Sequence, residues 1–153
     1  MTDLEGVVVR SHGGHYYVRW GQGLADCTMR GKLKQERGAS DLVAIGDRVR
    51  WSPTEGEFGI IEQVLPRKSV LSRCPPPPRA PVEQVIVANP DQALVVFAVR
   101  QPEPNPLMLD RYLVACEAVE LPVILIANKA DLLKKKRRDT FEMYRQIGYT
   151  VRY

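Results

Sequence analysis

The sequence has little cysteine and no long apolar run, and both features limit the class of protein. Its three cysteines, Cys27, Cys74 and Cys116, are odd in number, widely spaced and without a Cys-x-x-Cys pair. This pattern argues against a disulfide framework and against a zinc knot. No apolar run reaches the roughly 18 residues of a membrane span. The acidic start MTDLEGVVVRSHGG lacks the basic segment of a secretory signal. We therefore expect a cytoplasmic protein without a membrane partner.

Metal ligands are also scarce. His12 and His15 flank a Gly-Gly pair, but two imidazoles on a turn are too few for a metal site, so we expect an ordinary polar turn and no metal. The formal net charge is +4 and the pI is near 9.1. This mildly basic balance is compatible with an anionic partner such as nucleic acid without requiring one.

A proline-rich segment divides the chain. The stretch RKSVLSRCPPPPRAPVEQ contains four consecutive prolines, Pro75 to Pro78, followed by Pro81. Proline fixes φ, removes a hydrogen-bond donor and favours an extended path. The sequence therefore predicts a domain over 1–65, a linker over 66–84 and a second domain over 85–153.

The first part of the chain is rich in short strands and turns. We expect five strands, at Glu5–Arg10, His15–Trp20, Asp26–Lys34, Arg48–Ser52 and Gly59–Leu65. The Gly-Gly pair in Ser11 to Gly14 predicts a hairpin between the first two. Five short strands suit a small closed barrel, because closure removes exposed edges. An OB-fold is the leading interpretation, and an SH3-like barrel has a similar strand count.

The second part alternates apolar runs with helical patterns. Ala93–Val99 and Val123–Ala127 are continuously apolar, as in strands that are covered on both faces. Between them Asn105 can cap a helix that has Pro106 in its first position. Apolar positions then recur at helical spacing, at Leu109, Tyr112, Leu113 and Cys116. This order predicts a strand, a helix and a parallel strand, followed by a helix over about Leu132–Ile147 and a strand-like TVRY.

Polar residues directly follow the second apolar run, in the sequence Asn128-Lys129-Ala130-Asp131. Ligands of open α/β sheets bind at the carboxyl ends of the strands. There the Asp131 carboxylate could accept hydrogen bonds from N1–H and the amino group of guanine, whereas adenine offers an acceptor at that edge. The Lys129 stem could lie along the base, and Asn128 could pair with a ring edge. The alternative is a plain helix start, with Asn128 as the cap and Asp131 in the first turn.

A GTPase also needs a phosphate loop of the form G-x-x-x-x-G-K-S/T. These residues hold none: Gly31-Lys32 is followed by Leu33, and Asp26 stands where the first glycine should be. An ordinary GTPase carries that loop before its guanine motif. Either the motif is accidental, or the segments are permuted and the loop would lie beyond Tyr153.

Three cations of the third predicted strand alternate and would share one face of the barrel, with basic and aromatic residues available from the neighbouring strand. Such residues hold the nucleic-acid backbone and stack bases on OB surfaces. The alternative for them is a solvated barrel face. The candidates for RNA contact are Tyr17, Arg19, Trp20, Arg30, Lys32 and Lys34. The run Lys134 to Arg138 is more typical of a solvated surface, and Cys116 is expected in the core.

The order of these segments resembles a known family. A barrel carrying RGKLK and AIGDRVRW, then SVLSR, then QVIVANPDQALVVFAVRQPEPNPLMLDRYLVACEAVELPVILIANKADL is similar to the bacterial ribosome small-subunit-dependent GTPase A family, whose GTPase domain is circularly permuted. The resemblance implies an all-β OB-fold barrel followed by the first part of an α/β, P-loop GTPase-like domain. It covers nearly the whole chain, which looks like the front portion of such a protein.

The resemblance also implies a function. Members are GTP-hydrolysing factors of late small-subunit maturation that bind GTP with Mg and contact ribosomal RNA through the barrel. They carry zinc in a C-terminal domain, whose ligands are absent from this chain. Only Asn128, Lys129 and Asp131 match the family's nucleotide positions, so no catalytic residue is assigned and the chain alone is expected to be inactive. The alternative is a non-catalytic RNA-binding module in which Asn128 to Asp131 start a helix.

Overall fold

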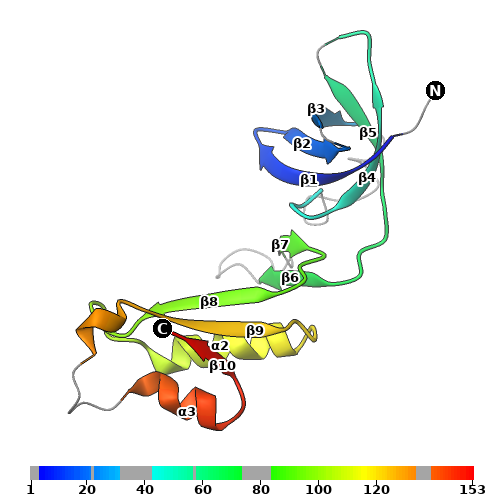
Figure 1. The fold of residues 1–153 in the computed structure, drawn as a ribbon. Coiled ribbons are helices and arrows are strands. Elements are labelled where there is room, and N and C mark those ends of the chain that lie inside the picture. Colours follow the sequence, from blue (N-terminus) through cyan, green and yellow to red (C-terminus); the bar gives the residue numbers. More distant parts are fainter. Residues whose placement is uncertain (1–3, 22, 32–42, 57, 74–83, 134–138) are drawn as a thin grey trace, which may run out of the picture. The chain divides into compact units, whose positions relative to one another are not determined.

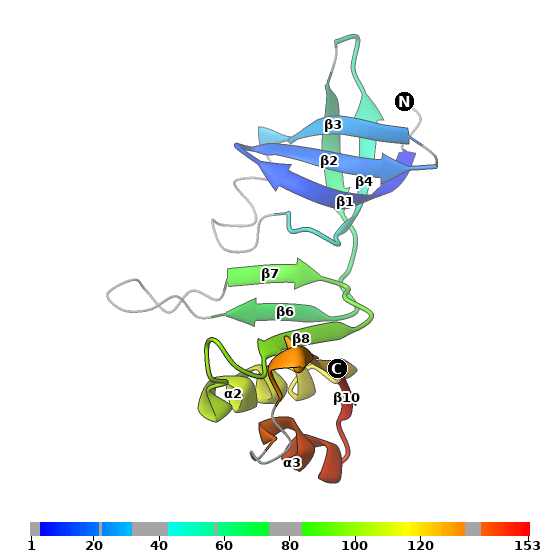
Figure 2. The ribbon, with the colours of Figure 1, turned by 60° about the vertical axis from the view of Figure 1, so that its left-hand side comes forward.

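The structure of the protein is a computed structural model that describes residues 4–21, 23–31, 43–56, 58–73, 84–133 and 139–153. The chain forms two compact units, Met1–Pro90 and Asp91–Tyr153. The first contains a β-barrel and a two-stranded sheet, and the second contains a three-stranded sheet with helices (Figures 1 and 2).

Five strands form the closed barrel of the first unit. They are β1 (Leu4–His12), β2 (His15–Trp20), β3 (Gly23–Met29), β4 (Arg48–Pro53) and β5 (Gly59–Val64). Their order around the barrel is β1-β2-β3-β5-β4, and β3 pairs with β5 in parallel. This Greek-key closure is that of an OB-fold. The prediction of a five-stranded OB barrel is confirmed, and the SH3-like alternative is not.

The first hairpin turns where the glycine pair predicts it. Gly13 and Gly14 have φ of 59° and 86°, the left-handed values that a tight two-residue hairpin turn requires.

The third strand differs from its predicted range, since it ends at Met29 instead of running to Lys34. Arg30 still donates its N–H to the carbonyl of Ile61 at 3.2 Å, and 32–42 lie outside the described residues.

Alternate residues of the strands fill the barrel. In β2, Tyr16 and Val18 point inward and are buried, whereas Arg19 is exposed. The fully buried core also includes Val8, Cys27 and Ile61, from three other strands. Buried and exposed side chains thus alternate along the strand, as expected for a barrel whose inner face forms the apolar core.

A two-stranded antiparallel sheet follows the barrel, within the same unit. It consists of β6 (Val70–Arg73) and β7 (Gln84–Ala88) (Figure 2). β6 thus occupies part of the segment for which the sequence predicts a linker. Pro75 to Pro78 and Pro81 lie outside the described residues, so the proline linker itself stays a prediction.

The second unit is built on a parallel sheet of order β10-β9-β8. Its elements are β8 (Ala93–Ala98), α2 (Pro106–Glu117), β9 (Val123–Asn128), a 3-10 turn η1 (Ala130–Leu132), α3 (Thr140–Gln146) and β10 (Thr150–Arg152). The Asn105 side chain caps α2 by accepting from the N–H of Met108, and Pro106 opens the helix. The predicted strand, helix and parallel strand are therefore confirmed, as is the final strand.

The predicted helix over Leu132–Ile147 is confirmed only for Thr140–Gln146, and its predicted start is wrong. Leu133 is extended, with φ of −70° and ψ of 117°, and ends the short η1 turn. The helix α3 begins only at Thr140, because Asp139 is itself extended and caps it by accepting from the N–H of Phe141. A carboxylate that competes for the first N–H groups sets the helix start, and periodicity alone misses it.

Helices α2 and α3 share one apolar cluster with the sheet. Val95, Leu109, Leu125, Phe141 and Val151 bring all three strands and both helices into it. The opposite side chains of β8 are exposed, Leu94 to 60% and Val96 to 55%. The prediction that this apolar strand is covered on both faces is wrong for this chain. Within the described ranges, no helix is long and apolar enough to span a membrane.

Candidate functional site

The motif Asn128 to Asp131 lies at the carboxyl end of β9, the central strand of the parallel sheet. Ala98, the last residue of β8, pairs in register with Asn128. The N–H of Val99 then donates to the carbonyl of Asn128 at 2.8 Å. The ends of two parallel strands therefore meet at one edge, the position in which α/β sheets bind ligands.

The backbone turns sharply within the motif. Lys129 has φ of 59° and ψ of 41°, a left-handed conformation, and its N–H donates to Oδ1 of Asn128 at 2.8 Å. Lys129 is the N-terminal flanking residue of η1, which has no side-chain cap. Asn128 therefore does not act as the helix cap that the alternative interpretation requires. Asp131 lies in the first turn of η1 and is exposed.

The loop after β8 contacts the same motif. The ammonium group of Lys129 donates to the carbonyl of Gln101, a residue with φ of 53°. Next to it, Nη1 of Arg100 pairs with Oε1 of Glu103 at 2.6 Å. Sequence reasoning misses this loop, although its position directly after a neighbouring parallel strand is a signal that could have placed it at the site.

The arrangement can present a base-recognising edge. Asn128, Lys129 and Asp131 are all exposed, and the backbone turns at the left-handed Lys129, between Asn128 and Asp131. A carboxylate in this position can accept two hydrogen bonds from adjacent donors of a planar ring.

The predicted RNA contacts fall into separate places on the barrel. Tyr17 and Arg19 alternate with buried Tyr16 and Val18 and so share the outer face of β2. Trp20, at the end of β2, is 39% exposed and packs edge-on against Trp51, with ring centroids 5.6 Å apart.

The other predicted cations are Arg30, Lys32 and Lys34, and the structure describes only the first of them. Arg30 forms an ion pair with Glu62, which also accepts from the hydroxyl of Ser52 at 3.0 Å. Its positive charge is therefore partly balanced within the barrel. Lys32 and Lys34 lie outside the described residues.

Sequence reasoning misses one cation on the outer face. Arg10 lies opposite Tyr17 in the first hairpin, and its guanidinium carbon is 4.9 Å from the centre of the Tyr17 ring. A guanidinium over an aromatic face is a favourable cation–π arrangement. The predicted Gly-Gly hairpin could have revealed the pair, because its register brings Arg10 across from Tyr17.

The histidine turn has ordinary polar contacts. Nδ1 of His15 lies 3.0 Å from Oδ1 of Asp26, and its ring packs edge-on with Phe58 at 5.4 Å. Among the residues that the structure describes, no group of three or more His, Cys, Asp or Glu side chains could hold a metal ion.

The two described cysteines are core residues. Burial raises the pKa of the Cys27 thiol to about 11, with a further contribution from the charge of Asp26. Burial also raises the pKa of the Cys116 thiol, and both side chains are buried. Thiols whose pKa is raised are poor nucleophiles at neutral pH, so the prediction of Cys116 as a core residue is confirmed.

The fold and the motif define the class of protein. An OB barrel precedes the first part of a P-loop GTPase-like α/β unit, and the motif Asn128 to Asp131 follows the central strand of its sheet. The family model for the RsgA N-terminal domain matches residues 5–61, and that for RsgA GTPase matches residues 64–153. The chain belongs to the RsgA GTPase family.

Relatives with this architecture are longer than the chain. The small ribosomal subunit biogenesis GTPase RsgA of Carboxydothermus hydrogenoformans is 38% identical over 146 residues, covering 94% of this chain and 45% of the relative. The protein of the same name from Gemmatimonas aurantiaca is 43% identical over 135 residues, covering 86% and 44%. The chain thus spans about half the length of the curated relatives it matches.

Solved structures agree with the fold. The crystal structure of YjeQ from Thermotoga maritima matches with a TM-score of 0.71 at 28% identity, over 98% of this chain and 51% of that one. The crystal structure of YloQ, described as a circularly permuted GTPase, matches with a TM-score of 0.69 at 28% identity, over 98% and 50%. The match with a circularly permuted GTPase agrees with the family that the sequence resembles.

Proposed function

We propose that this chain supplies the RNA-binding barrel and the guanine-recognising edge of a GTP-binding and GTP-hydrolysing factor that acts in late maturation of the small ribosomal subunit. The observation that carries the proposal is the placement of Asn128, Lys129 and Asp131 at the carboxyl end of the central parallel strand, in a chain of the RsgA GTPase family. Relatives named as small ribosomal subunit biogenesis GTPases support the process and the partner.

The proposed chemistry of base selection follows from donors and acceptors. The Asp131 carboxylate accepts from N1–H and the exocyclic amino group of guanine. Adenine would place its N1 lone pair against the carboxylate and leave a charge without a partner. The Lys129 stem, held at its end by the Gln101 carbonyl, lies along the base, and Asn128 contacts the ring edge.

The chain offers residues that could recognise the guanine base, but it lacks residues that would hold the phosphates and Mg²⁺. The sequence contains no G-x-x-x-x-G-K-S/T loop, and the described residues contain no acidic cluster suited to Mg²⁺. No catalytic residue is therefore assigned. We expect the chain by itself to release no phosphate from GTP above background, with or without small ribosomal subunits, because the groups that stabilise phosphoryl charge are missing. A robust rate stimulated by the subunit would overturn this assignment.

The guanine-recognising edge is tested by Asp131→Asn. The amide then opposes a donor of guanine but matches xanthine, which has a carbonyl where guanine has its amino group. Nuclear magnetic resonance titrations with guanosine and xanthosine monophosphates should show that the wild-type chain prefers guanosine and that the variant prefers xanthosine. Asp139→Asn is the matched control, because asparagine caps a helix as well as aspartate does and Asp139 caps α3. Equal losses of affinity for both nucleotides in Asp131→Asn would contradict guanine recognition by Asp131.

The proposed RNA surface is the outer face formed by Arg10, Tyr17 and Arg19, and Trp20 at the end of β2 remains a further candidate. Ribosomal RNA phosphates would pair with the arginines, and bases would stack on the aromatic rings. Arg30, Lys32 and Lys34 remain further candidates, and the pairing of Arg30 with Glu62 weakens its contribution.

Salt dependence distinguishes this surface from a solvated one. Each phosphate contact contributes roughly 0.7 to 0.9 to the slope of log affinity against log salt concentration. The double variant with Arg10→Ala and Arg19→Ala should therefore have a slope that is less steep by roughly 1.4 to 1.8 in filter binding to ribosomal RNA. Arg145→Ala is the matched control, because Arg145 belongs to the second unit and pairs with Glu142. An unchanged slope in the double variant would mean that the outer face does not contact RNA.

A further inference from the structure

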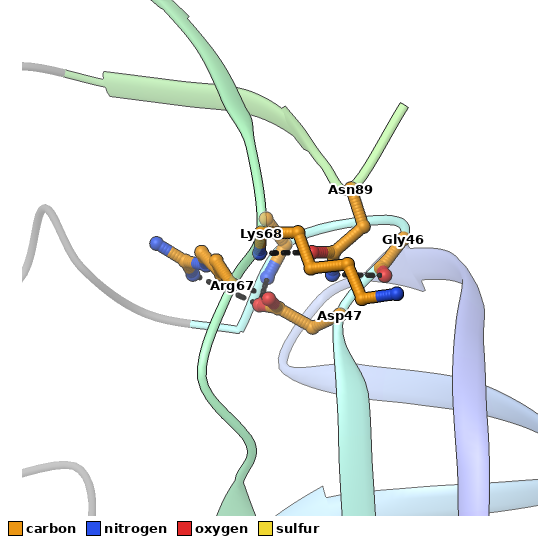
Figure 3. A network of polar contacts seen from close by, with 6 residues as sticks. Gly46, Asp47, Arg67, Lys68 and Asn89 are labelled. Carbon is orange, nitrogen blue, oxygen red and sulfur yellow. Dashed lines mark hydrogen bonds and ion pairs between the residues drawn. The ribbon is translucent and has the colours of Figure 1, made fainter. Parts of the chain in front are cut away.

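Three segments of the first unit meet at the base of the β6–β7 hairpin. They are the turn before β4, which carries Gly46 and Asp47, the segment between β5 and β6, which carries Arg67 and Lys68, and Asn89 directly after β7. Figure 3 shows their side chains and backbone converging there. We call Gly46, Asp47, Arg67 and Asn89 the joint.

The centre of the joint is a buried ion pair. The Asp47 side chain is fully buried, and the Arg67 side chain is 12% exposed. Nε and Nη2 of Arg67 donate to the two carboxylate oxygens of Asp47 at 2.8 and 2.9 Å. The N–H of Ala44 also donates to Oδ2 of Asp47, at 2.7 Å. A two-point Arg–carboxylate contact fixes direction as well as distance, so the chain leaving the barrel is held at Arg67.

The second contact of the joint is the Asn89 amide, which uses both of its polar atoms. Oδ1 of Asn89 accepts from the N–H of Lys68 at 2.7 Å, and Nδ2 donates to the carbonyl of Gly46 at 3.0 Å. Asn89 has φ of 50°, a left-handed value that asparagine tolerates better than most residues. One side chain therefore connects the start of the hairpin, its end and the barrel.

Backbone contacts complete the joint. The N–H of Ala88 donates to the carbonyl of Ile45 at 2.8 Å, and the N–H of Asn89 donates to that of Ser69 at 2.8 Å. Gly46 has φ of 90°, and a Cβ at this position would lie 1.9 Å from the carbonyl oxygen of Ala88. Glycine is therefore required where the barrel turn approaches β7.

Most of the described side chains of the hairpin are only partly buried. A two-stranded sheet alone is marginally stable in water. In β6, Val70, Leu71 and Ser72 are only half-buried, and in β7 Ile86 is 50% exposed while Ala88 is buried. The buried end of the hairpin is thus the end that the joint contacts.

We propose that the joint is a rigid mechanical coupling by which the β6–β7 hairpin turns with the barrel as one body. The joint ends at Asn89, and Pro90 is the last residue of the first unit. A ligand that orients the barrel therefore also sets the direction in which the chain leaves this unit. The contacts of the joint come from residues 44–47, 67–69 and 88–89 and do not depend on the guanine assignment.

The coupling is tested on the whole chain with Asn89→Gly. Glycine keeps the left-handed backbone and removes both amide contacts. Residual dipolar couplings of wild-type amides in the barrel and the hairpin should fit one alignment tensor. In the variant the hairpin should need its own tensor. Exchange of the Ala88 amide hydrogen should become roughly 5- to 30-fold faster, the factor for one or two lost hydrogen bonds. The barrel amide of Val18 should not change.

A second variant and a control complete the experiment. Arg67→Ala removes the ion pair, and it is interpreted only if Val18 exchange shows that the barrel remains folded. If the barrel does not remain folded in Arg67→Ala, Asn89→Gly is the deciding variant. Of the Asn89 side-chain contacts described above, only the one with the Gly46 carbonyl reaches the barrel turn. Lys68→Ala removes a neighbouring positive charge, keeps the backbone N–H that Asn89 uses, and should behave as wild type. Two tensors in the wild-type chain, or one shared tensor with Ala88 exchange within about twofold of wild type in Asn89→Gly, would overturn the proposal.

Discussion

The hydroxyl of Tyr144 should be a main link between the two helices of the second unit. The side chain is 1% exposed, and its hydroxyl donates to Oδ1 of Asp110 on α2 at 2.7 Å. In Tyr144→Phe this contact is lost while the ring remains in the core. Hydrogen bonds to charged groups contribute about 1.5 to 3 kcal/mol. Because Asp110 is exposed and can be hydrated again in the variant, we expect the lower end, about 1.5 kcal/mol.

Thermal unfolding can assign this loss to the second unit. About 1.5 kcal/mol in a unit of this size corresponds to a fall in Tm of roughly 6 to 12 °C. Both tryptophans, Trp20 and Trp51, lie in the barrel, so their fluorescence follows the first unit. Helices α2 and α3 lie in the second unit, so far-ultraviolet circular dichroism in the helical band follows that unit. Only the helical transition should move in Tyr144→Phe.

The matched control is Tyr112→Phe, the same chemical change on α2. The Tyr112 ring is 48% exposed and packs edge-on with Phe97, so the free energy of unfolding should change by less than about 0.5 kcal/mol. A Tyr144→Phe variant as stable as this control would refute the argument, since the hydroxyl would then contribute nothing to the packing of α3 on α2.

Three further predictions concern Cys27, Tyr149 and Gly46. The Cys27 pKa is raised from 9.0 to about 11, so native iodoacetamide labelling, followed by mass spectrometry, should be about a hundredfold slower than in the unfolded chain; equal rates would contradict burial. Hydrogen bonding to Glu117 raises the pKa of Tyr149 from 10.0 to about 12. Its stabilising contribution should therefore be complete below pH 10 and decline up to about pH 12 in denaturant titrations, and Tyr149→Phe should lose that dependence. Gly46→Ala should destabilise the first unit by more than about 2 kcal/mol in the tryptophan transition, and a smaller cost would mean that the turn can move away from Ala88.

Local sequence signals determined the elements that depend on neighbours in the chain. The Gly-Gly pair placed the first hairpin, Asn105-Pro106 placed the start of α2, and the apolar runs placed β8 and β9. Asn128 to Asp131 could be located at a strand end from sequence alone, because the motif directly follows an apolar run. These features arise from backbone φ preferences and from capping by the nearest side chains, which are written in a few consecutive residues.

Contacts between distant residues were decided only by the tertiary structure. The parallel pairing of β3 with β5 separates an OB barrel from an SH3-like one, and strand periodicity is the same in both. The ion pair between Arg30 and Glu62, the Lys129 contact with Gln101, and the joint at Asp47 each connect positions at least 20 residues apart. Whether a charge is exposed, paired or buried depends on which segments the fold brings together, and no local pattern of residues encodes that.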